Sequence, residues 1–369
     1  AGDRVAIGAY MNDGTGSLAG HVRVYSIPVT VQTTYVPDDN FEQALIDLGY
    51  DDVLDDYVVT DSISGVTSLD VGEKEISDLT GIEDFTALTI LSCGQNQLTS
   101  LDVSSNTALT ILSCRNNQLT SLDVSTNTSL TSLRCYDNQL TSLDVSANTA
   151  LTYLYCYTNQ LAALDVSANT ALTLLTCSIN ELTALDVSNN TALTTLYCRS
   201  NQLTALDVSA NTALTSLNCR NNQLTSLDVS NNTALATLEC HQNQITALDM
   251  SANTALTSLN CRNNQLTYLN MKNGVTDALT TFNATNNDSL ECIETLDTTY
   301  ATENWTYENG NIDLGVTFAV NCTPGYTYVP DDNFEQALID LGFDDTLDNF
   351  VVTDSINSVT VLNVSNDSI

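Results

Sequence analysis

Cysteine recurs every 21 residues through the middle of this 369-residue chain. A fixed period of this length predicts one small structural unit stacked on copies of itself, so we expect a solenoid rather than a globular domain. The nine cysteines that keep the period are Cys93, Cys114, Cys135, Cys156, Cys177, Cys198, Cys219, Cys240 and Cys261.

The pattern around each cysteine occurs twice in every unit. In one unit, Leu133 and Cys135 belong to the first half, and Leu143 and Val145 belong to the second. Their alternation is typical of a strand whose side chains point in, out and in. Because 21 residues leave no room for a helix, we expect two short strands per coil, the second less regular, and two narrow parallel sheets. Asn138 and its equivalents fall where the chain turns and can bond backbone groups of adjacent coils.

The full motif, L-x-x-L-x-C-x-x-N-x-L, resembles the leucine-rich repeat, in the 21-residue form found in secreted proteins of the Bacteroidetes. The resemblance covers residues 34 to 325. It implies a β-rich solenoid: a leucine-rich-repeat array with 21-residue coils, parallel β-sheets, a helical N-terminal cap and a disulfide-closed C-terminal cap.

Six segments are predicted along the chain. Residues 1–27 have the pattern of a hairpin around a glycine-rich turn, which resembles part of an FG-GAP propeller repeat, and residues 28–33 form a linker. Residues 34–87 form the N-terminal cap with a short helix, 88–290 the solenoid, and 291–325 the C-terminal cap. Residues 326–369 repeat the first cap and start a second one, so the chain has the pattern of a piece of a longer tandem array.

The N-terminal cap carries a helix signature. Asp39 and Glu42 have capping-box spacing, with the aspartate expected at the N-cap and the glutamate at N3. Phe41, Leu45 and Leu48 then line one face, which we expect to cover the first coil.

The cysteines divide into two kinds. Those of the repeat occupy inward positions where other leucine-rich repeats have leucine, so we expect them buried and reduced. Cys292 and Cys322 lie outside the repeat and flank Trp305. The family resemblance implies a disulfide between them, which would close the C-terminal cap and indicate an oxidising compartment.

Charge and composition exclude several functions. A net charge of −36 argues against nucleic acids and anionic membrane surfaces, since both bind through clustered Lys and Arg. No apolar run is long enough to insert into a bilayer. His21 and His241 lie near no nucleophile signature, so we expect no enzyme activity.

Outward positions beside the cysteines vary from coil to coil, while packing positions do not. Five of the nine basic residues and five of the fifteen tyrosines fall there. Tyrosine and arginine are enriched at binding hot spots, so we interpret these positions as a ligand-binding strip on the concave sheet; the alternative is harmless drift on a solvated face. The strip contains Arg115, Arg134, Tyr136, Tyr153, Tyr155, Tyr157, Tyr197, Arg199, Arg220, His241 and Arg262.

No cofactor is expected, and the alternative is that the chain binds Ca²⁺. An aspartate column, represented by Asp144, has the pattern of a solvated face, with calcium between coils as the alternative. The better calcium candidate is the cluster of Asp51, Asp52, Asp55 and Asp56. Short D-S/T-apolar motifs resemble O-glycosylation sites of these bacteria, at Ser62, Ser289, Thr298, Thr346 and Ser355.

The sequence therefore predicts an extracellular or cell-surface, non-catalytic adhesion module that binds a protein or polysaccharide of a host, neighbouring cell or matrix. The resemblance further implies export by the type IX secretion route. The alternative is a structural spacer or filament-forming subunit of a giant tandem-array protein. Head-to-tail self-association through residues 326–369 is a further expectation.

Overall fold

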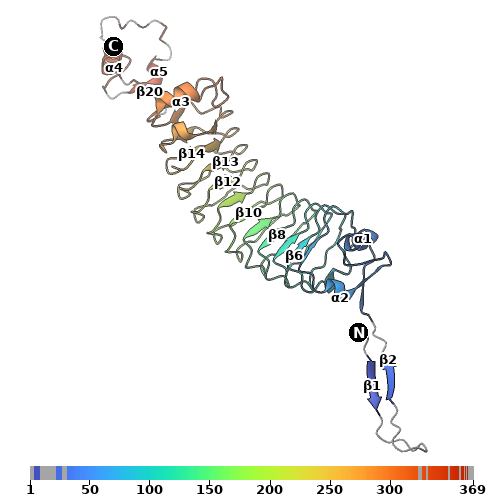
Figure 1. Cartoon of the computed structure of the whole chain (residues 1–369). Helices are drawn as coiled ribbons and strands as arrows, with labels where there is room; N and C mark the ends of the chain where they lie inside the picture. Colours follow the sequence, from blue (N-terminus) through green and yellow to red (C-terminus); the bar gives the residue numbers. More distant parts are fainter. Residues whose placement is uncertain are drawn as a thin grey trace, which may run out of the picture.

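The computed structural model describes residues 4–8, 22–26, 31–322, 326–329, 331–347, 350–356 and 359–360, together with 362 and 364. Its main body is an elongated solenoid with one cap at each end (Figure 1). An 11-stranded parallel sheet runs along it in the order β17-β15-β13-β12-β11-β10-β9-β8-β7-β6-β5. The prediction of a solenoid with parallel strands and 21-residue coils is confirmed.

The strands of this sheet are three residues long because only the x-Leu-x segment of each coil is extended. Neighbouring strands pair in register, so that Leu133 lies beside Leu154 and Leu154 beside Leu175. The strands are β5 (Ser68–Asp70), β6 (Ile90–Ser92), β7 (Ile111–Ser113), β8 (Ser132–Arg134), β9 (Tyr153–Tyr155), β10 (Leu174–Thr176), β11 (Thr195–Tyr197), β12 (Ser216–Asn218), β13 (Thr237–Glu239), β15 (Ser258–Asn260) and β17 (Thr281–Asn283).

The core is a set of apolar columns. In one coil, Leu154, Cys156, Leu161, Val166 and Leu172 are all fully buried. All nine cysteines of the repeat are buried and free, as predicted. In the described part of the chain, the like residues of successive coils stack on one another, so burial of each apolar side chain depends on the next coil.

Two asparagine columns join the coils. Asn159 in the first column donates to the carbonyl oxygens of Cys135 and Cys156 at 3.1 and 3.2 Å and accepts from the amide of Leu140 at 2.9 Å. This confirms the predicted role of that column. The second column was not singled out from the sequence, yet it is buried more deeply: Asn169 is fully buried and donates to Val145 and Asn148 at 2.9 Å each.

The second sheet is shorter than predicted. It contains β14 (Ala247–Asp249), β16 (Tyr268–Asn270), β18 (Cys292–Glu294) and β19 (Thr317–Ala319). In earlier coils the corresponding segment forms no strand. There the aspartate accepts the amide of the serine two residues later, as in Asp144 and Ser146 at 2.9 Å. Asp249 of β14 makes the same bond to Ser251 at 2.8 Å, so this Asx turn is compatible with a strand.

The N-terminal cap contains β3 (Thr33–Tyr35), α1 (Asp39–Asp47), β4 (Tyr57–Val59), α2 (Thr60–Ile63) and the short helix η1 (Ile82–Asp84), with β3 and β4 paired. The N-cap of α1 is Asp38, not Asp39 as predicted. Its Oδ1 accepts the amides of Asn40 and Phe41, while Oδ2 accepts the amide and hydroxyl of Ser77. Asp38 thereby ties the helix to the first coil.

The helix face differs from the prediction in two residues. Phe41 and Leu45 are fully buried, whereas Leu48 is 46% exposed because it is the C-cap. Glu42 does not complete a capping box: it is fully buried, and its Oε1 accepts the amides of Asp55 and Tyr57 at 3.0 and 3.1 Å. Glu42 therefore shapes the loop that follows the helix.

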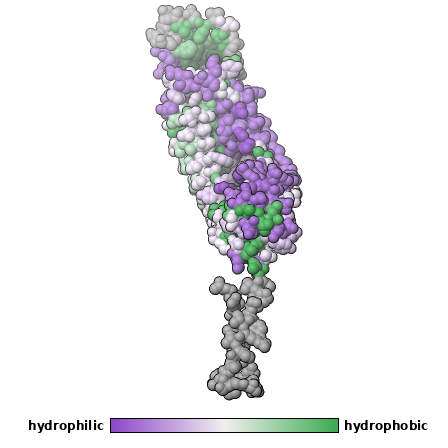
Figure 2. Space-filling model, turned by 45° about the vertical axis from the view of Figure 1, so that its right-hand side comes forward, coloured by the Kyte–Doolittle hydropathy of each residue, from purple (hydrophilic) through white to green (hydrophobic). Residues whose placement is uncertain are grey.

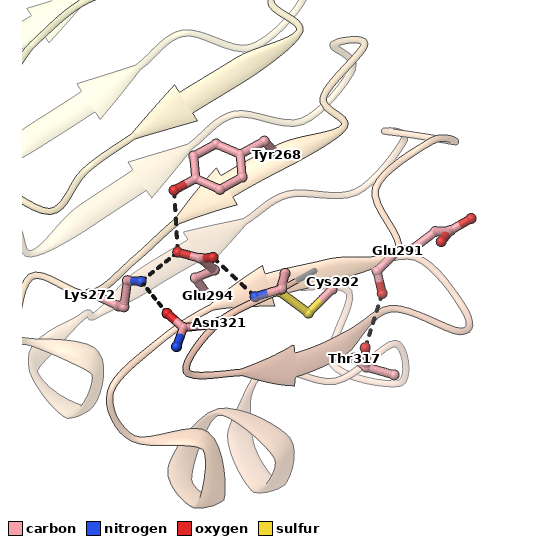
Figure 3. The surroundings of a disulfide bond; sticks show 8 residues. Tyr268, Lys272, Glu291, Cys292, Glu294, Thr317 and Asn321 are labelled. Carbon is pink, nitrogen blue, oxygen red and sulfur yellow. Dashed lines mark hydrogen bonds and ion pairs between the residues drawn. A yellow bond between two sulfur atoms is a disulfide. The ribbon is translucent and has the colours of Figure 1, made fainter. Parts of the chain in front are cut away.

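The C-terminal cap closes the other end. It contains η2 (Thr276–Ala278) and α3 (Thr298–Asn304), and Trp305 stacks on Phe282 with ring centroids 4.0 Å apart. The predicted disulfide joins Cys292 to Cys322. Beside it, the buried carboxylate of Glu294 binds Lys272 at 2.7 Å, the Tyr268 hydroxyl at 3.2 Å and the Cys322 amide at 3.0 Å (Figure 3).

Two further segments lie outside the capped solenoid. The predicted N-terminal hairpin is present as antiparallel β1 (Arg4–Gly8) and β2 (Val22–Ser26), and the expected glycine-rich turn lies outside the described residues. The repeated cap sequence forms β20 (Tyr326–Tyr328), α4 (Asp332–Asp340), β21 (Phe350–Val352) and α5 (Thr353–Ile356), beyond α3 in Figure 1. Helices α1 and α4 have the same nine-residue sequence.

Candidate functional site

The candidate site is the outward face of the 11-stranded sheet. All but one of the predicted residues lie in two parallel rows, one on the last residue of each strand and one just after the cysteine; Tyr153 is the first residue of β9. We call the full predicted set the tyrosine–arginine strip: Arg115, Arg134, Tyr136, Tyr153, Tyr155, Tyr157, Tyr197, Arg199, Arg220, His241 and Arg262. Strand register sets the rows, since Arg134 pairs with Tyr155.

Aromatic rings gather in the middle of this strip. Tyr136 and Tyr157, which belong to adjacent coils, stack with centroids 4.3 Å apart and planes 12° apart. The guanidinium of Arg134 lies 5.5 Å from the Tyr155 ring centroid, and that of Arg115 lies 5.9 Å from Tyr136. Burial, with the Tyr136 hydroxyl beside it, raises the pKa of Tyr157 to about 12, so its hydroxyl stays protonated. These contacts hold the rings before any partner arrives.

A hollow of about 320 Å³ opens beside the stacked rings. Its position follows from a coil inside the strip that lacks large side chains in both rows: Thr176 and Ser178 are small and buried there. The hydroxyl of Tyr197 reaches the Ser216 hydroxyl at 3.2 Å, in the coil beyond. The residues that line the hollow are Arg134, Tyr136, Tyr155, Tyr157, Leu174, Thr176 and Tyr197.

A second, polar hollow of about 480 Å³ lies at the N-terminal end of the strip and shares Arg134 and Arg115 with it. Here the row after the cysteine contains Gly94 instead of a side chain. A Cβ on Gly94 would come within 2.8 Å of the Arg115 Cγ, so glycine is what allows that arginine to lie over the coil. Asp70 and Glu73 also line this hollow, which gives it mixed charge.

The C-terminal end of the strip is a row of arginines. Arg199 and Arg220 occupy adjacent coils, and Arg262 follows two coils later. His241 lies between Arg220 and Arg262 but is 2% exposed, so the prediction that it points outward as a contact residue is wrong. Its short imidazole packs beside Glu239, with Nδ1 3.1 Å from a carboxylate oxygen. Burial, with the charges of Arg220 and Arg262, lowers the pKa of His241 to about 4, so it is neutral at pH 7.

The arginines of the strip differ from the described lysines in their ion pairing. Among the residues that the structure describes, ion pairs join Lys74 to Asp47 and Lys272 to Glu294, while the five arginines of the strip form none. The chain has 45 acidic residues, so unpaired guanidiniums on one face are not explained by a shortage of carboxylates. The structure leaves these donors facing solvent.

Other predicted sites are placed as follows. Asp51 is half-buried, and Asp52, Asp55 and Asp56 are exposed. Burial, followed by the charges of Glu42, Asp52 and Asp55, raises the pKa of Asp51. Within the described ranges, no three acidic, histidine or cysteine side chains are grouped as a metal site, and calcium at this cluster stays a prediction.

The nine thiols of the repeat present no reactive site. Burial raises the pKa of every one, and those of Cys114, Cys177, Cys219 and Cys261 reach about 12. Thiolate formation is therefore suppressed in the folded state. The exposed aspartates from Asp102 to Asp228 have lowered pKa values, as at Asp144, because the serine two residues on bonds the carboxylate.

The predicted glycosylation residues differ in exposure. Ser62, Ser289 and Thr346 are exposed, whereas Thr298 and Ser355 are half-buried. Modification at any of them stays a prediction. In the described portion, none of the helices is both long and apolar enough to cross a bilayer.

No protein-family model matches the chain. Internalin J of Listeria monocytogenes is 41% identical over 105 residues, which make up 26% of this chain and 11% of internalin J. The solved functional domain of internalin J, described as including a cysteine ladder, matches with a TM-score of 0.61 and 38% identity. That match covers 74% of this chain and 65% of that domain.

More distant structures share only the fold. A leucine-rich-repeat protein of Leptospira interrogans matches with a TM-score of 0.54 at 23% identity, over 63% of this chain and 68% of that protein. The ectodomain of a receptor kinase of Arabidopsis thaliana matches with a TM-score of 0.56 at 20% identity, over 64% and 33%. The coil length, the buried cysteine column and these likenesses together show that the chain is a leucine-rich-repeat solenoid, similar to the functional domain of internalin J of Listeria.

Proposed function

We propose that this chain is an extracellular or cell-surface, non-catalytic adhesion module that binds a protein or polysaccharide partner through the tyrosine–arginine strip. The observation that carries the proposal is the open hollow bordered by Tyr155, Tyr157 and Tyr197, with Arg134 beside it. Aromatic side chains held in place by stacking lose little entropy on binding, and tyrosine and arginine supply most hot-spot energy.

The variation within the chain supports this proposal. Coils that share their buried leucines and asparagines differ at the strip positions, so the packing of the solenoid does not select the tyrosines. A solvated face would be satisfied by serine or threonine, which occupy many of the same positions in other coils. Relation to internalin J, a protein of Listeria, favours a surface location; the disulfide favours an oxidising compartment.

The test compares strip variants for adhesion. The triple variant Tyr153→Ala/Tyr155→Ala/Tyr157→Ala should lose binding to a panel of immobilised matrix proteins and glycans, because it removes one wall of the hollow. The matched control Thr204→Ala/Thr225→Ala/Gln223→Ala changes exposed residues of later coils away from the strip and should bind as the native chain does. Equal binding by native chain and triple variant, with unchanged circular dichroism, would refute the proposal.

A structural role as spacer or filament-forming subunit is the second candidate, because the cap helix occurs twice in one chain. Figure 2 shows an apolar patch at the N-terminal cap, and the exposed aliphatic residues of this cap include Val53 (51%) and Leu54 (49%). Head-to-tail contact through residues 326–369 would cover such a surface. Sedimentation velocity of the full chain against a chain ending at residue 325 checks this: assembly should rise with concentration only in the former.

We also propose an origin, an export route and an N-terminal domain relationship for the chain. The likeness of residues 1–27 to an FG-GAP repeat, a Bacteroidetes origin and the type IX route are supported by the sequence motifs alone. Intact mass of the secreted protein would reveal O-glycans at the predicted serines and threonines.

A further inference from the structure

The tyrosine–arginine strip contains a coil without an aromatic ring, followed along the solenoid by arginines that form no ion pair. The spacing between this gap and the arginines limits which partner could contact both. Tyr136 and Tyr157 show that rings in adjacent coils stack at the coil spacing. In the next coil, Thr176 and Ser178 contribute no ring, and the coil after that has Tyr197. Coils repeat about every 4.8 Å, so the flanking backbones of Tyr155 and Tyr197 are about 10 Å apart. One planar ring from a partner fits there over Thr176, in the row next to the Tyr136–Tyr157 stack.

The cations lie on one side of this gap. Arg199 is one coil beyond the gap, Arg220 two coils and Arg262 four coils, which corresponds to roughly 5, 10 and 19 Å along the solenoid axis. Among the described residues, no carboxylate lies within ion-pair distance of these arginines. The Glu239 carboxylate accepts from Asn260 and lies beside the His241 imidazole instead. His241 adds no charge at pH 7 because its pKa is about 4.

We infer that the strip recognises an extended, acidic segment of a protein partner that places one aromatic side chain in the gap and carboxylates along Arg199, Arg220 and Arg262. This inference rests on the proposed function and specifies its partner. Alternate side chains of an extended peptide point the same way about every 6.8 Å. An aromatic residue followed by acids at the second, fourth and sixth positions therefore sets them at about 7, 14 and 20 Å, alongside the three guanidiniums. Arginine binds carboxylates through bidentate hydrogen bonds, which fixes the register.

The probe is a fluorescein-labelled peptide, Trp-Gly-Glu-Gly-Glu-Gly-Glu. A second peptide with the reversed sequence tests in which direction the partner segment runs along the strip. Two matched peptides replace every glutamate with glutamine or the tryptophan with alanine. Binding to the full chain is followed by fluorescence anisotropy at two salt concentrations. We expect the acidic aromatic peptide to bind at least tenfold more tightly than either matched peptide, and to weaken as salt rises.

The protein variants separate charge from fold. Arg220→Gln/Arg262→Gln should weaken binding of the acidic peptide at least tenfold and leave binding of the glutamine peptide unchanged. Thr204→Glu/Thr225→Glu makes the same change in net charge at exposed positions away from the strip and should bind like the native chain. Unchanged thermal midpoints establish that all variants are folded.

Three outcomes would overturn the inference. Equal binding of the glutamate and glutamine peptides would show that the strip does not recognise the carboxylates of a partner segment. Arginine-dependent binding of a uronic-acid polysaccharide, with no peptide bound, would change the class of partner. Failure of all these probes, together with tyrosine-dependent binding to the immobilised panel, would leave the proposed function standing without this specificity. The proposed function itself would be refuted if the tyrosine variant bound the immobilised panel as the native chain does.

Discussion

The first asparagine column should contribute more to stability than its partial exposure suggests, and Asn159 tests this. Asn159→Ala deletes two donated hydrogen bonds at 3.1 and 3.2 Å and one accepted bond at 2.9 Å, all at buried sites, together with a longer donated bond to the Tyr157 carbonyl at 3.4 Å. Each net bond contributes about 1 kcal/mol, and each orphaned buried group costs about 1–3 kcal/mol, so we expect a loss of about 3–5 kcal/mol. Asn169→Ala deletes two donated bonds and should cost about 2–3 kcal/mol, although Asn169 is buried more completely.

Urea unfolding followed by circular dichroism measures the free energies, and amide hydrogen exchange at Leu140 reads the local bond. The control Gln160→Ala changes an exposed neighbour and should shift stability by less than about 0.5 kcal/mol. A decrease of the slope m in Asn159→Ala would mean that the solenoid unfolds in parts at that coil. A cost equal to that of the control, with Leu140 still protected, would refute the reasoning.

Three other predictions concern the thiols, the disulfide and the histidine. Iodoacetamide should label none of the nine cysteines of the repeat in the native chain, because burial suppresses their thiolates, and all nine in urea without reductant. Mass spectrometry counts the labels, and rapid labelling of the native chain would contradict this prediction. Cys292→Ala/Cys322→Ala should lower the free energy of unfolding by about 3–4 kcal/mol and make stability insensitive to reductant, whereas Cys135→Ala should leave the reductant response intact. His241 has a folded-state pKa of about 4 and an ordinary value of 6.5, so the unfolded state binds its proton first as pH falls. It should therefore destabilise the chain progressively between pH 6.5 and 4, by about 1–3 kcal/mol, and unfolding curves of native chain and His241→Gln should diverge in that window; parallel curves would reject the assignment.

Much of the fold was predictable because the period is rigid. Once residues recur every 21 positions, register follows, and like residues such as Leu133 and Leu154 must stack. The buried thiols were predictable because their cysteines keep the period, and the disulfide was implied by the family resemblance for the two cysteines outside it. The second sheet was overestimated, because most coils form no strand at the Leu-Asp-Val-Ser segment. The Asx bond does not decide this, since Asp144 makes it without a strand and Asp249 makes it within β14.

The site was predicted only in part. The positions of Arg134 and Tyr155 on the strip were correct, but the hollow depends on what is missing from one coil. Thr176 and Ser178 interrupt the two rows, and that interruption was the signal in the sequence that could have located it. His241 shows the opposite limit: periodicity places it on the outward row, yet its surroundings bury it.

The sequence by itself determined the coil, its inward columns and the order of side chains along the strip, because a strict repeat converts spacing along the chain directly into spacing in space. Only the tertiary structure decided which outward side chains stack, which are covered and where a hollow remains. Those outcomes depend on the sizes and charges of residues 21 positions apart, which become neighbours only after the coils have stacked.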